Sequence, residues 1–378
     1  MKIALVTPYD GSVPGGVAEH IAALRAELLA IGHEALVLMP GSRRSRIERV
    51  ADGYRIGRAI SLPSNRSRAR ITLDPTAVRD VRDVMRRERF DVVHVHAPHT
   101  PLLPYLALLW SDAANVGTFH AALGNRSWYL AARPVLSPIL GRLHARIAVS
   151  SVAMAGCRHH FGGAYEIIPN GISVERFRTN ATASEAPRAP DGMPRVLFVG
   201  RFEEPRKGFA DLCRAMAIVQ RTLPRARLVV VGPGDTMRAR ILAERTGVRN
   251  VDLVGQVPAD DLPGFYAGCD VVCAPSTGRE SFGMVLLEAM ASGTPLVATA
   301  IPGYAAVATG GHDALLAPPG CPSLLAEALT RALCDSDLRA RLRTAGLATA
   351  RRYDWPGIAR RILQVYFLAL RRQSKGSP

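Results

Sequence analysis

The sequence has few cysteines and lacks long hydrophobic runs. Six cysteines are scattered over 378 residues without a Cys-x-x-Cys pair, which indicates reduced thiols and argues against a disulfide framework. Cys157 has His159 and His160 nearby, but no second ligand pair follows at zinc spacing, so we expect no zinc site. Beyond the N-terminus, the longest apolar stretch, residues 101–110, contains two prolines and is about half as long as a membrane span. We therefore expect no transmembrane segment.

Signals for export and for nucleic-acid binding are also missing. The apolar run at the N-terminus is too short for a signal peptide and soon reaches Pro14-Gly15-Gly16, so we expect a cytoplasmic protein that begins with a buried strand. The formal net charge of +16 favours anionic partners such as a phospholipid surface or a nucleotide sugar. No aromatic residues interleave the basic runs, so we expect no nucleic-acid partner. We also expect a monomer.

Strand-like and helix-like segments alternate along the whole chain, which indicates an α/β fold with parallel sheets. The length predicts two domains, each Rossmann-like. We place them at residues 1–177 and 195–354, joined by a polar linker at 178–194 and followed by a C-terminal helix at 355–378. Helices are predicted at 17–31 and 209–222. Strands are predicted at 2–7, 35–39, 92–96, 115–119, 146–149, 195–199, 228–231, 252–254, 271–274 and 296–298. Two such domains in tandem predict a ligand-binding cleft between them.

Two segments suit the binding of phosphate groups. After the first strand, Gly15 and Gly16 lead into a helix N-terminus, where backbone amides can approach a diphosphate. After the first strand of the second domain, the loop 200–208 contains Arg201, Arg206 and Lys207. These cations can neutralise a departing nucleoside diphosphate without a metal, so we expect no metal and no cofactor. A tight turn without ligand and a solvated charged loop remain the alternatives.

Two carboxylates lie eight positions apart near the end of the second domain. Glu280 belongs to a loop with Gly278 and Gly283, and Glu288 lies in the helix that follows. Eight helical residues span roughly 12 Å, and the free amides of the helix N-terminus lie beside them. One carboxylate can hold a hexose and the other a ribose.

Three histidines end two of the predicted strands. His120 follows the strand at 115–119, and alternation places His94 and His96 on one face of the strand at 92–96. A histidine at the carboxyl end of a strand can contact a ligand, although a structural role is the alternative for each.

At these residues the chain resembles the family 4 retaining glycosyltransferases, which have two Rossmann-like domains (GT-B type), over nearly its whole length. The resemblance is carried by the Glu280–Glu288 pair, by Arg201 with Lys207, and by the early Gly-Gly turn. Within that family, one combination of motifs is similar to the phosphatidyl-myo-inositol mannosyltransferases, which use GDP-mannose: Val-Pro-Gly-Gly-Val, Thr-Phe-His, Ile-Pro-Asn-Gly, Glu-Pro-Arg-Lys-Gly and Tyr-Asp-Trp.

The resemblance implies a role for each matching residue. Arg201 and Lys207 would hold the diphosphate, Glu280 the mannose hydroxyls, Glu288 the ribose, and His120 would lie near the transferred sugar. Arg201, Lys207, Glu280 and His120 are the implied catalytic residues. The remaining implied donor-binding residues are Gly15, Gly16, Val257, Ser281, Phe282 and Gly283. The resemblance also implies retention of configuration and a C-terminal helix that crosses back to the first domain.

The implied acceptor site lies in the first domain. The loop 63–70 resembles the family's lipid-headgroup loop, with cations suited to a phosphodiester. The implied acceptor-binding residues are Tyr9, Asn65, Ser67 and Arg70. A basic amphipathic helix follows, in which arginines surround Val78, Val81 and Met85 and could lie on anionic lipid. Its membrane-facing candidates are Arg79, Arg82, Arg86 and Arg87. A surface helix that packs its apolar side inward fits equally well.

The resulting hypothesis is a mannosyltransferase, peripheral to the inner face of the cell membrane, that transfers mannose from GDP-mannose to phosphatidylinositol. One alternative is another family 4 enzyme that builds a glycolipid or polysaccharide from a UDP- or GDP-sugar. Alternatives of another class are a sugar-nucleotide epimerase and a non-catalytic nucleotide-sugar binder.

Overall fold

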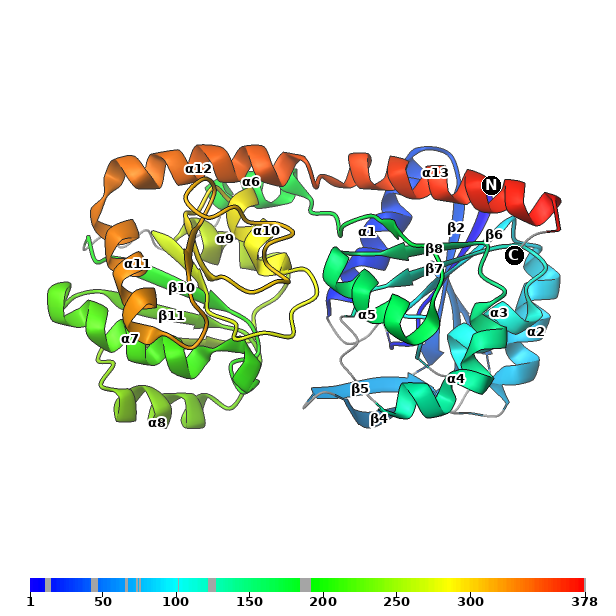
Figure 1. The fold of residues 1–378 in the computed structure, drawn as a ribbon, viewed down its shortest axis with the longest axis horizontal. Helices are drawn as coiled ribbons and strands as arrows, with labels where there is room; N and C mark the ends of the chain where they lie inside the picture. The colour runs from blue at the N-terminus through cyan, green and yellow to red at the C-terminus, as the bar shows by residue number, and fades with distance from the viewer. Residues whose placement is uncertain are drawn as a thin grey trace. The chain divides into compact units, whose positions relative to one another are not determined.

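The computed structural model describes residues 1–10, 15–41, 47–64, 67–72, 74, 76–100, 102–121, 127–183 and 192–376. They form two compact units, Met1–Gly171 with Trp355–Pro378 and Ile172–Asp354. Each unit is a mostly parallel sheet with helices on both faces (Figure 1). The expected class, α/β with two Rossmann-like domains, is confirmed.

The sheet of the first unit has the strand order β3-β4-β2-β1-β6-β7-β8-β9, and β5 pairs with β4. The parallel strands that follow the predicted pattern are β1 (Lys2–Val6), β2 (Glu34–Gly41), β6 (Val92–His96), β7 (Ala114–Phe119) and β8 (Ala145–Ala148), with β9 (Glu166–Ile167) at the edge. At the other edge, β3 (Ile47–Val50) and β5 (Ser67–Thr72) pair antiparallel with β4 (Gly53–Ser64).

Alternation along β1 assigns the helices of this unit to two faces. Ile3 and Leu5 pack with α1 (Gly16–Ala30) and α13 (Trp355–Ser374). Ala4 and Val6 face the opposite core, which is covered by α2 (Ala77–Glu88), α3 (Leu103–Trp110), α4 (Ser127–Leu140) and α5 (Ser151–Phe161). The C-terminal helix α13 contacts β7, β8 and α1 (Figure 1). It therefore completes the first unit although it follows the second in sequence.

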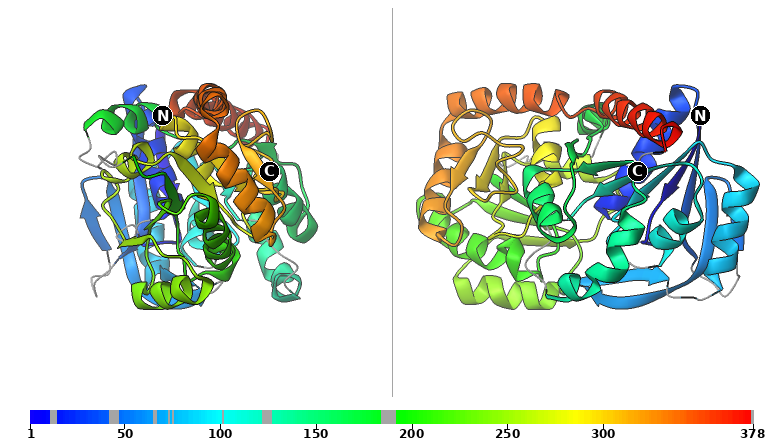
Figure 2. Two further views of the ribbon diagram at one scale, coloured as in Figure 1. Left: turned by 90° about the vertical axis from the view of Figure 1, so that its left-hand side faces the viewer. Right: turned by 45° about the vertical axis from the view of Figure 1, so that its right-hand side comes forward.

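The sheet of the second unit is parallel throughout, in the order β12-β11-β10-β13-β14-β15. Its strands are β10 (Arg195–Val199), β11 (Arg227–Val231), β12 (Val251–Gly255), β13 (Val271–Ala274), β14 (Leu296–Thr299) and β15 (Leu315–Ala317). One face packs on α7 (Phe209–Thr222), α8 (Thr236–Thr246) and α11 (Pro322–Cys334), and α7 lies beside α11 (Figure 2). The other elements are α6 (Val174–Ala183), α9 (Leu262–Ala267), α10 (Met284–Ala291), α12 (Ser336–Arg351) and a 3₁₀ turn, η1 (Pro205–Lys207).

Both sheets reverse their strand order at the first strand. β1 lies between β2 and β6, and β10 lies between β11 and β13. In open parallel sheets, ligands bind outside the carboxyl ends of the strands at such a reversal. The Gly15-Gly16 turn follows β1, and the loop 200–208 follows β10, so both predicted phosphate-binding segments lie at these positions.

Two local expectations differ from the structure. In the segment 63–70, expected to be a loop, the described residues belong to β4 and β5, with Leu62 opposite Ala69 and Ser64 opposite Ser67. The arginines concealed the strand pattern, because β5 (Ser-Arg-Ala-Arg-Ile-Thr) is formed by antiparallel pairing with β4 and not by a run of apolar residues. Helix α6 also continues to Ala183, inside the predicted linker, as its alanine content favours. The two units divide after Gly171.

Candidate active site

The predicted donor residues of the second unit meet beyond β10 and β13. Lys207 Nζ and Arg206 Nη1 each lie 2.7 Å from Glu280 Oε1. Ser276 Oγ lies 3.3 Å from the same oxygen. The structure thus brings together Lys207 and Glu280, which are 73 positions apart in the sequence, at the point where the sheet reverses its order.

Close backbone packing holds the two loops in register. Gly208 has a φ of 72°, and a Cβ at this position would lie 1.9 Å from the carbonyl oxygen of Pro275. The amide of Thr277 donates to the carbonyl of Arg206 at 2.8 Å. A Cβ at Gly303 would lie 2.0 Å from the carbonyl oxygen of Glu280. The carboxylate and its cations are therefore presented by a rigid pair of loops.

Arg206 was predicted only as a cation for the diphosphate and Glu204 was not predicted, but the two are structural partners. Arg206 Nη2 lies 2.6 Å from Glu204 Oε2, and Glu204 is buried. Arg206 is therefore held between Glu204 and Glu280 and orients the latter. Arg201 Nη1 is 3.6 Å from Glu204 Oε1, and its side chain is 42% exposed, so a ligand can reach it. The pair of acids followed by a pair of cations in Glu-Glu-Pro-Arg-Lys was the available signal.

Ser276 and Tyr304 form a hydrogen-bonded chain to Glu280. Neither residue was predicted from the sequence. Tyr304 donates to Ser276 Oγ at 2.8 Å, and burial raises the pKa of Tyr304. Its phenol therefore stays protonated and can keep donating. Nothing in the sequence indicated this contact, because Tyr304 lies 28 residues beyond Ser276.

The other carboxylate, Glu288, is buried in α10. The hydroxyl of Tyr266 donates to Glu288 Oε2 at 2.5 Å. Gly283 is the N-cap of this helix, with a φ of 93°, and Ser281 is half-buried. Phe282 is buried against the ring of Tyr353, so it can offer a ligand only its main chain.

Further candidate donor and acceptor residues among the described ones follow β1 and β12. Among the described residues, nothing lies within 4 Å of a Cβ placed on Gly15 or Gly16, beside the first turn of α1. Tyr9 is half-buried after β1, and burial raises the pKa of its phenol. Val257 is half-buried after β12, and no described contact joins it to the Glu280 cluster.

The histidines form one cluster with His20 of α1. His94 Nδ1 lies 2.7 Å from the hydroxyl of Tyr366, and His94 Nε2 lies 2.7 Å from Thr118 Oγ1. His96 Nδ1 lies 3.0 Å from His120 Nε2. The prediction that His94 and His96 share a face is confirmed, since their rings are 4.2 Å apart. His94 is bound into the core between α13 and β7, whereas His96 contacts the candidate catalytic residue.

Burial keeps these imidazoles neutral. It lowers the pKa of His20 and His94 to about 3, and it lowers the pKa values of His96 and His120 well below the usual range. The side chain of Asn170, from the Ile-Pro-Asn-Gly motif, acts in the opposite direction at His20 and His120. His120 itself is half-buried, so a ligand can reach it.

Three nitrogens, from His20, His96 and His120, lie within 4.8 Å of one another. Such a set can ligate a transition metal, but the His96–His120 pair has the geometry of a hydrogen bond. A shared tetrahedral metal with bonds of about 2.0–2.1 Å would hold the two nitrogens roughly 3.3 Å apart, with both lone pairs turned toward the metal. Here they are 3.0 Å apart, and the separation of the ring centroids, 5.3 Å, indicates that they point at each other.

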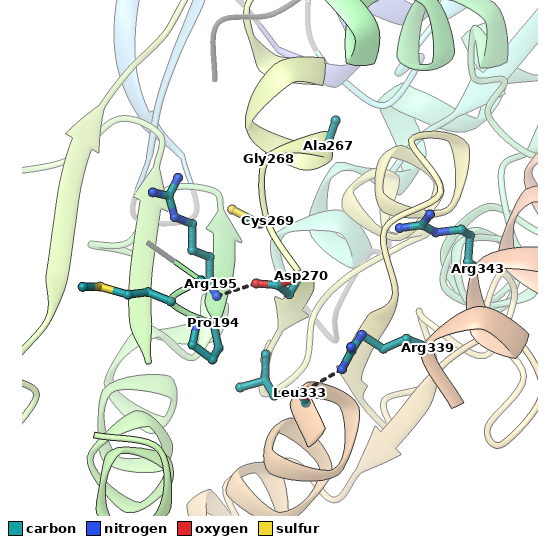
Figure 3. A pocket seen from close by; sticks show the side chains of 11 residues that line it. Pro194, Arg195, Ala267, Gly268, Cys269, Asp270, Leu333, Arg339 and Arg343 are labelled. Carbon is teal, nitrogen blue, oxygen red and sulfur yellow. Dashed lines mark hydrogen bonds between the residues drawn. The ribbon is translucent and has the colours of Figure 1, made fainter. Parts of the chain in front are cut away.

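A cavity of about 530 Å³ lies elsewhere in the second unit (Figure 3). It is lined by Arg195, Asp270, Arg339 and Arg343, among others. Arg195 begins β10 and Asp270 precedes β13, so the cavity lies at the amino ends of these strands. It is therefore separate from the Glu280 cluster, which lies beyond their carboxyl ends.

The structure describes the acceptor candidates only in part. Asn65 lies outside the described residues. Ser67 and Arg70 are described by their backbone alone, in β5, where Arg70 pairs with Ser61.

The amphipathic helix α2 packs its apolar side inward. Val81 and Met85 are buried in the core of the first unit, so they are not available to lipid. Arg79, Arg86 and Arg87 are exposed, and the guanidinium of Arg82 lies 4.7 Å from the Trp110 ring. Among the described residues, no helix combines the length and the apolar character needed to span a bilayer.

Comparison with known proteins identifies the family. Residues 14–176 match Glycosyltransferase Family 4, and residues 193–335 match Glycosyl transferases group 1. The chain is 36% identical to the phosphatidyl-myo-inositol mannosyltransferase of Mycobacterium tuberculosis (strain CDC 1551 / Oshkosh), over 97% of this chain and 96% of the relative. The chain belongs to glycosyltransferase family 4.

Another relative and a solved structure support the same family and fold for this family 4 glycosyltransferase. It is 34% identical to the phosphatidyl-myo-inositol mannosyltransferase of Propionibacterium freudenreichii subsp. shermanii, over 98% of this chain and 95% of that protein. Its fold matches sucrose-phosphate synthase from Thermosynechococcus elongatus with a TM-score of 0.77, at 22% identity, over 97% of this chain and 98% of that one. The two Rossmann-like domains are therefore those of a GT-B glycosyltransferase.

Proposed function

We propose that this family 4 glycosyltransferase is a retaining mannosyltransferase that transfers mannose from GDP-mannose to phosphatidylinositol at the cytoplasmic face of the membrane. One observation carries the proposal. A chain that is 36% identical to a phosphatidyl-myo-inositol mannosyltransferase over 97% of its length holds Glu280 between Lys207 and Arg206, where a parallel sheet binds its ligand.

The contacts of Glu280 support a role in binding the sugar. Its contacts with described residues all reach Oε1, so Oε2 can accept hydrogen bonds from the mannose hydroxyls. Lys207 and Arg201 neutralise the diphosphate as it leaves. Because Lys207 is already paired with Glu280, the bound diphosphate shares this cation with the carboxylate.

The remaining roles follow the resemblance. The amides at Gly15 and Gly16 approach the diphosphate, Glu288 binds the ribose, and His120 contacts the transferred sugar. The strand pair β4–β5, with Ser67 and Arg70, receives the inositol phosphate together with Asn65 and Tyr9. The exposed arginines of α2 attach the protein to anionic lipid through charge alone, because the apolar side of the helix is buried.

A transfer assay tests the proposal. Purified protein is incubated with labelled GDP-mannose or UDP-glucose, with and without phosphatidylinositol vesicles, after treatment with a metal chelator. We expect a mannolipid only from GDP-mannose with phosphatidylinositol, with the anomeric configuration of the donor. Glu280→Gln should abolish the product, whereas Glu203→Gln, an exposed carboxylate of the same loop, should not.

Each alternative gives a different result. A labelled lipid or polymer from UDP-glucose supports another family 4 transferase. An epimerised sugar nucleotide without acceptor supports an epimerase, and tight donor binding without turnover supports a binding protein. Absence of mannolipid under every condition overturns the proposal.

A further inference from the structure

The two rings of His96 and His120 are joined end to end. His96 Nδ1 lies 3.0 Å from His120 Nε2, the ring planes differ by 22°, and the ring centroids are 5.3 Å apart. This separation is close to the N···N distance plus the reach from each centroid to its own nitrogen, so both nitrogens lie near one line. A linear contact of this length between neutral imidazoles requires one N–H donor and one lone-pair acceptor.

The surroundings of His96 decide which nitrogen carries the hydrogen. His96 is fully buried, and burial keeps it neutral by lowering its pKa, so the ring carries a single N–H. Its other nitrogen, Nε2, is buried without a hydrogen-bond partner among the described residues. A hydrogen on Nε2 would be an orphaned buried N–H, which is rarer in proteins than an under-used acceptor. The hydrogen therefore belongs on Nδ1, which faces His120.

The consequence passes to His120. If His96 Nδ1 donates, His120 Nε2 accepts, and the only hydrogen of the neutral His120 ring is on its Nδ1. We propose that His96 is a positioning residue that holds His120 in the Nδ1–H tautomer, so that His120 offers a ligand oxygen a hydrogen-bond donor and not a base.

This role of His120 rests on the proposed function, in which His120 contacts the transferred sugar. With Nε2 occupied by His96, its Nδ1–H donates to a hydroxyl oxygen of the transferred sugar. His120 then orients the sugar and takes no proton from it. The adjacent His94 ring, bound to Tyr366 and Thr118, packs against His96 at 4.2 Å and limits its rotation.

Nitrogen NMR on the full-length protein labelled with ¹⁵N-histidine reads the tautomer directly and needs no substrate. The His120 signals are assigned by their loss in His120→Gln. We expect His120 Nδ1 to have the shift of a protonated nitrogen and Nε2 that of a bare one. The reverse assignment overturns the proposal, and it does so whether or not the protein transfers mannose.

Substitutions of His96 test the direction of the bond in catalysis. An Asn amide nitrogen can replace Nδ1 as a donor, an Asp carboxylate can only accept, and Leu can do neither. We expect His96→Asn to retain the Nδ1–H spectrum of His120 and most of kcat. His96→Asp and His96→Leu should lower kcat about tenfold or more, the effect of roughly 1.4 kcal/mol in the transition state, with little change in KM for the donor.

The control is His160→Asn, at a buried histidine of α5 outside the cluster. It should lower the melting temperature without altering the His120 spectrum or kcat, which separates loss of packing from loss of positioning. An active His96→Asp would show that His96 accepts the hydrogen, and three equally active His96 variants would show that it positions nothing. Either result overturns the proposal.

Discussion

The two cations that pair with Glu280 contact the same carboxylate oxygen. Lys207 and Arg206 both reach Oε1, and Arg206 is itself held by the buried Glu204. Charge-assisted bonds of this kind are shorter and stronger than neutral ones, so they set the direction of the carboxylate. Arg201, with its partly exposed side chain, is the cation of this loop that is most accessible to a ligand.

Replacing Lys207 with Gln should slow transfer strongly. The charge on the departing diphosphate would lose one of its two proposed cations, and removal of a single such group costs roughly 10²–10³-fold in kcat. The measurement is kcat with GDP-mannose and phosphatidylinositol. Arg221→Gln, which removes one positive charge from the exposed end of α7, is the matched control, and an equal loss in both variants would contradict a specific role for Lys207.

The buried histidines should make the protein less stable in acid. The folded-state pKa of His94 is about 3, below the ordinary value of 6.5, so the stability it contributes is complete above pH 6.5 and is lost as the pH falls toward 3. At pH 5 the loss in the free energy of unfolding is about 2 kcal/mol for one such histidine. Urea unfolding of the full chain at pH 7 and pH 5 measures the difference. His94→Asn should flatten this pH dependence, and an unchanged slope would refute the explanation.

At the scale of the elements, the loop after β10 and the loop after β13 are packed together and hold one another in place. The packing of Gly208 on Pro275 and the bond from Thr277 to Arg206 hold them together. The antiparallel strands β4 and β5 and the helix α2 form a second such region in the first unit, in which α2 contacts β4. The donor and acceptor proposals therefore depend on different pairs of elements.

Gly208→Ala should separate the two donor loops. Its φ of 72° already disfavours a side chain, and the added Cβ would collide with the Pro275 carbonyl. Gly247→Ala is the matched control, because Gly247 has a φ of 87° but only one atom near the Cβ position, at 3.9 Å. The free energy of unfolding should fall by about 1–2 kcal/mol in the control. It should fall further in Gly208→Ala, which should also bind the donor more weakly. Equal unfolding free energies in the two variants would argue against the interlocked loops.

The arginines of α2 should attach the protein to anionic vesicles. In a variant with Ser at Arg79, Arg86 and Arg87, the binding free energy should weaken by about 1 kcal/mol per arginine. Together the three changes should lower the affinity for the vesicles by on the order of a hundredfold. Sedimentation with phosphatidylinositol-containing and neutral vesicles measures this. A variant with Ser at Arg238, Arg240 and Arg245 of α8 removes the same charge from another exposed helix. If both variants bind equally, net charge and not α2 is responsible.

At the scale of the whole molecule, donor and acceptor should protect different parts of the chain. A ligand at about a hundred times its Kd adds about 2.7 kcal/mol to the stability of the state that binds it. In hydrogen exchange of the full chain, GDP-mannose should slow exchange most in residues 200–208 and 276–291. It should leave β4 and β5 unchanged until an inositol phosphate is added. Equal protection by UDP-glucose would contradict a guanine nucleotide donor.

The sequence by itself determined the α/β class, the positions of ten of the described strands and the donor motifs. These are local signals: runs such as Val271–Ala274 and residues 296–298 are apolar along a stretch of neighbours, and Glu280 and Glu288 keep their spacing wherever the helix packs. The family resemblance rests on the same short motifs.

Only the tertiary structure decided which groups complete those motifs. The cationic partners of Glu280 come from a loop more than 70 residues earlier, His96 meets His120 across two strands, and β5 is a strand because β4 pairs with it. In α2 the apolar side was equally suited to lipid or to a core, and the neighbouring α3 settled it by covering that side. Such contacts join residues distant in sequence, and their energy depends on burial and orientation that no local pattern contains.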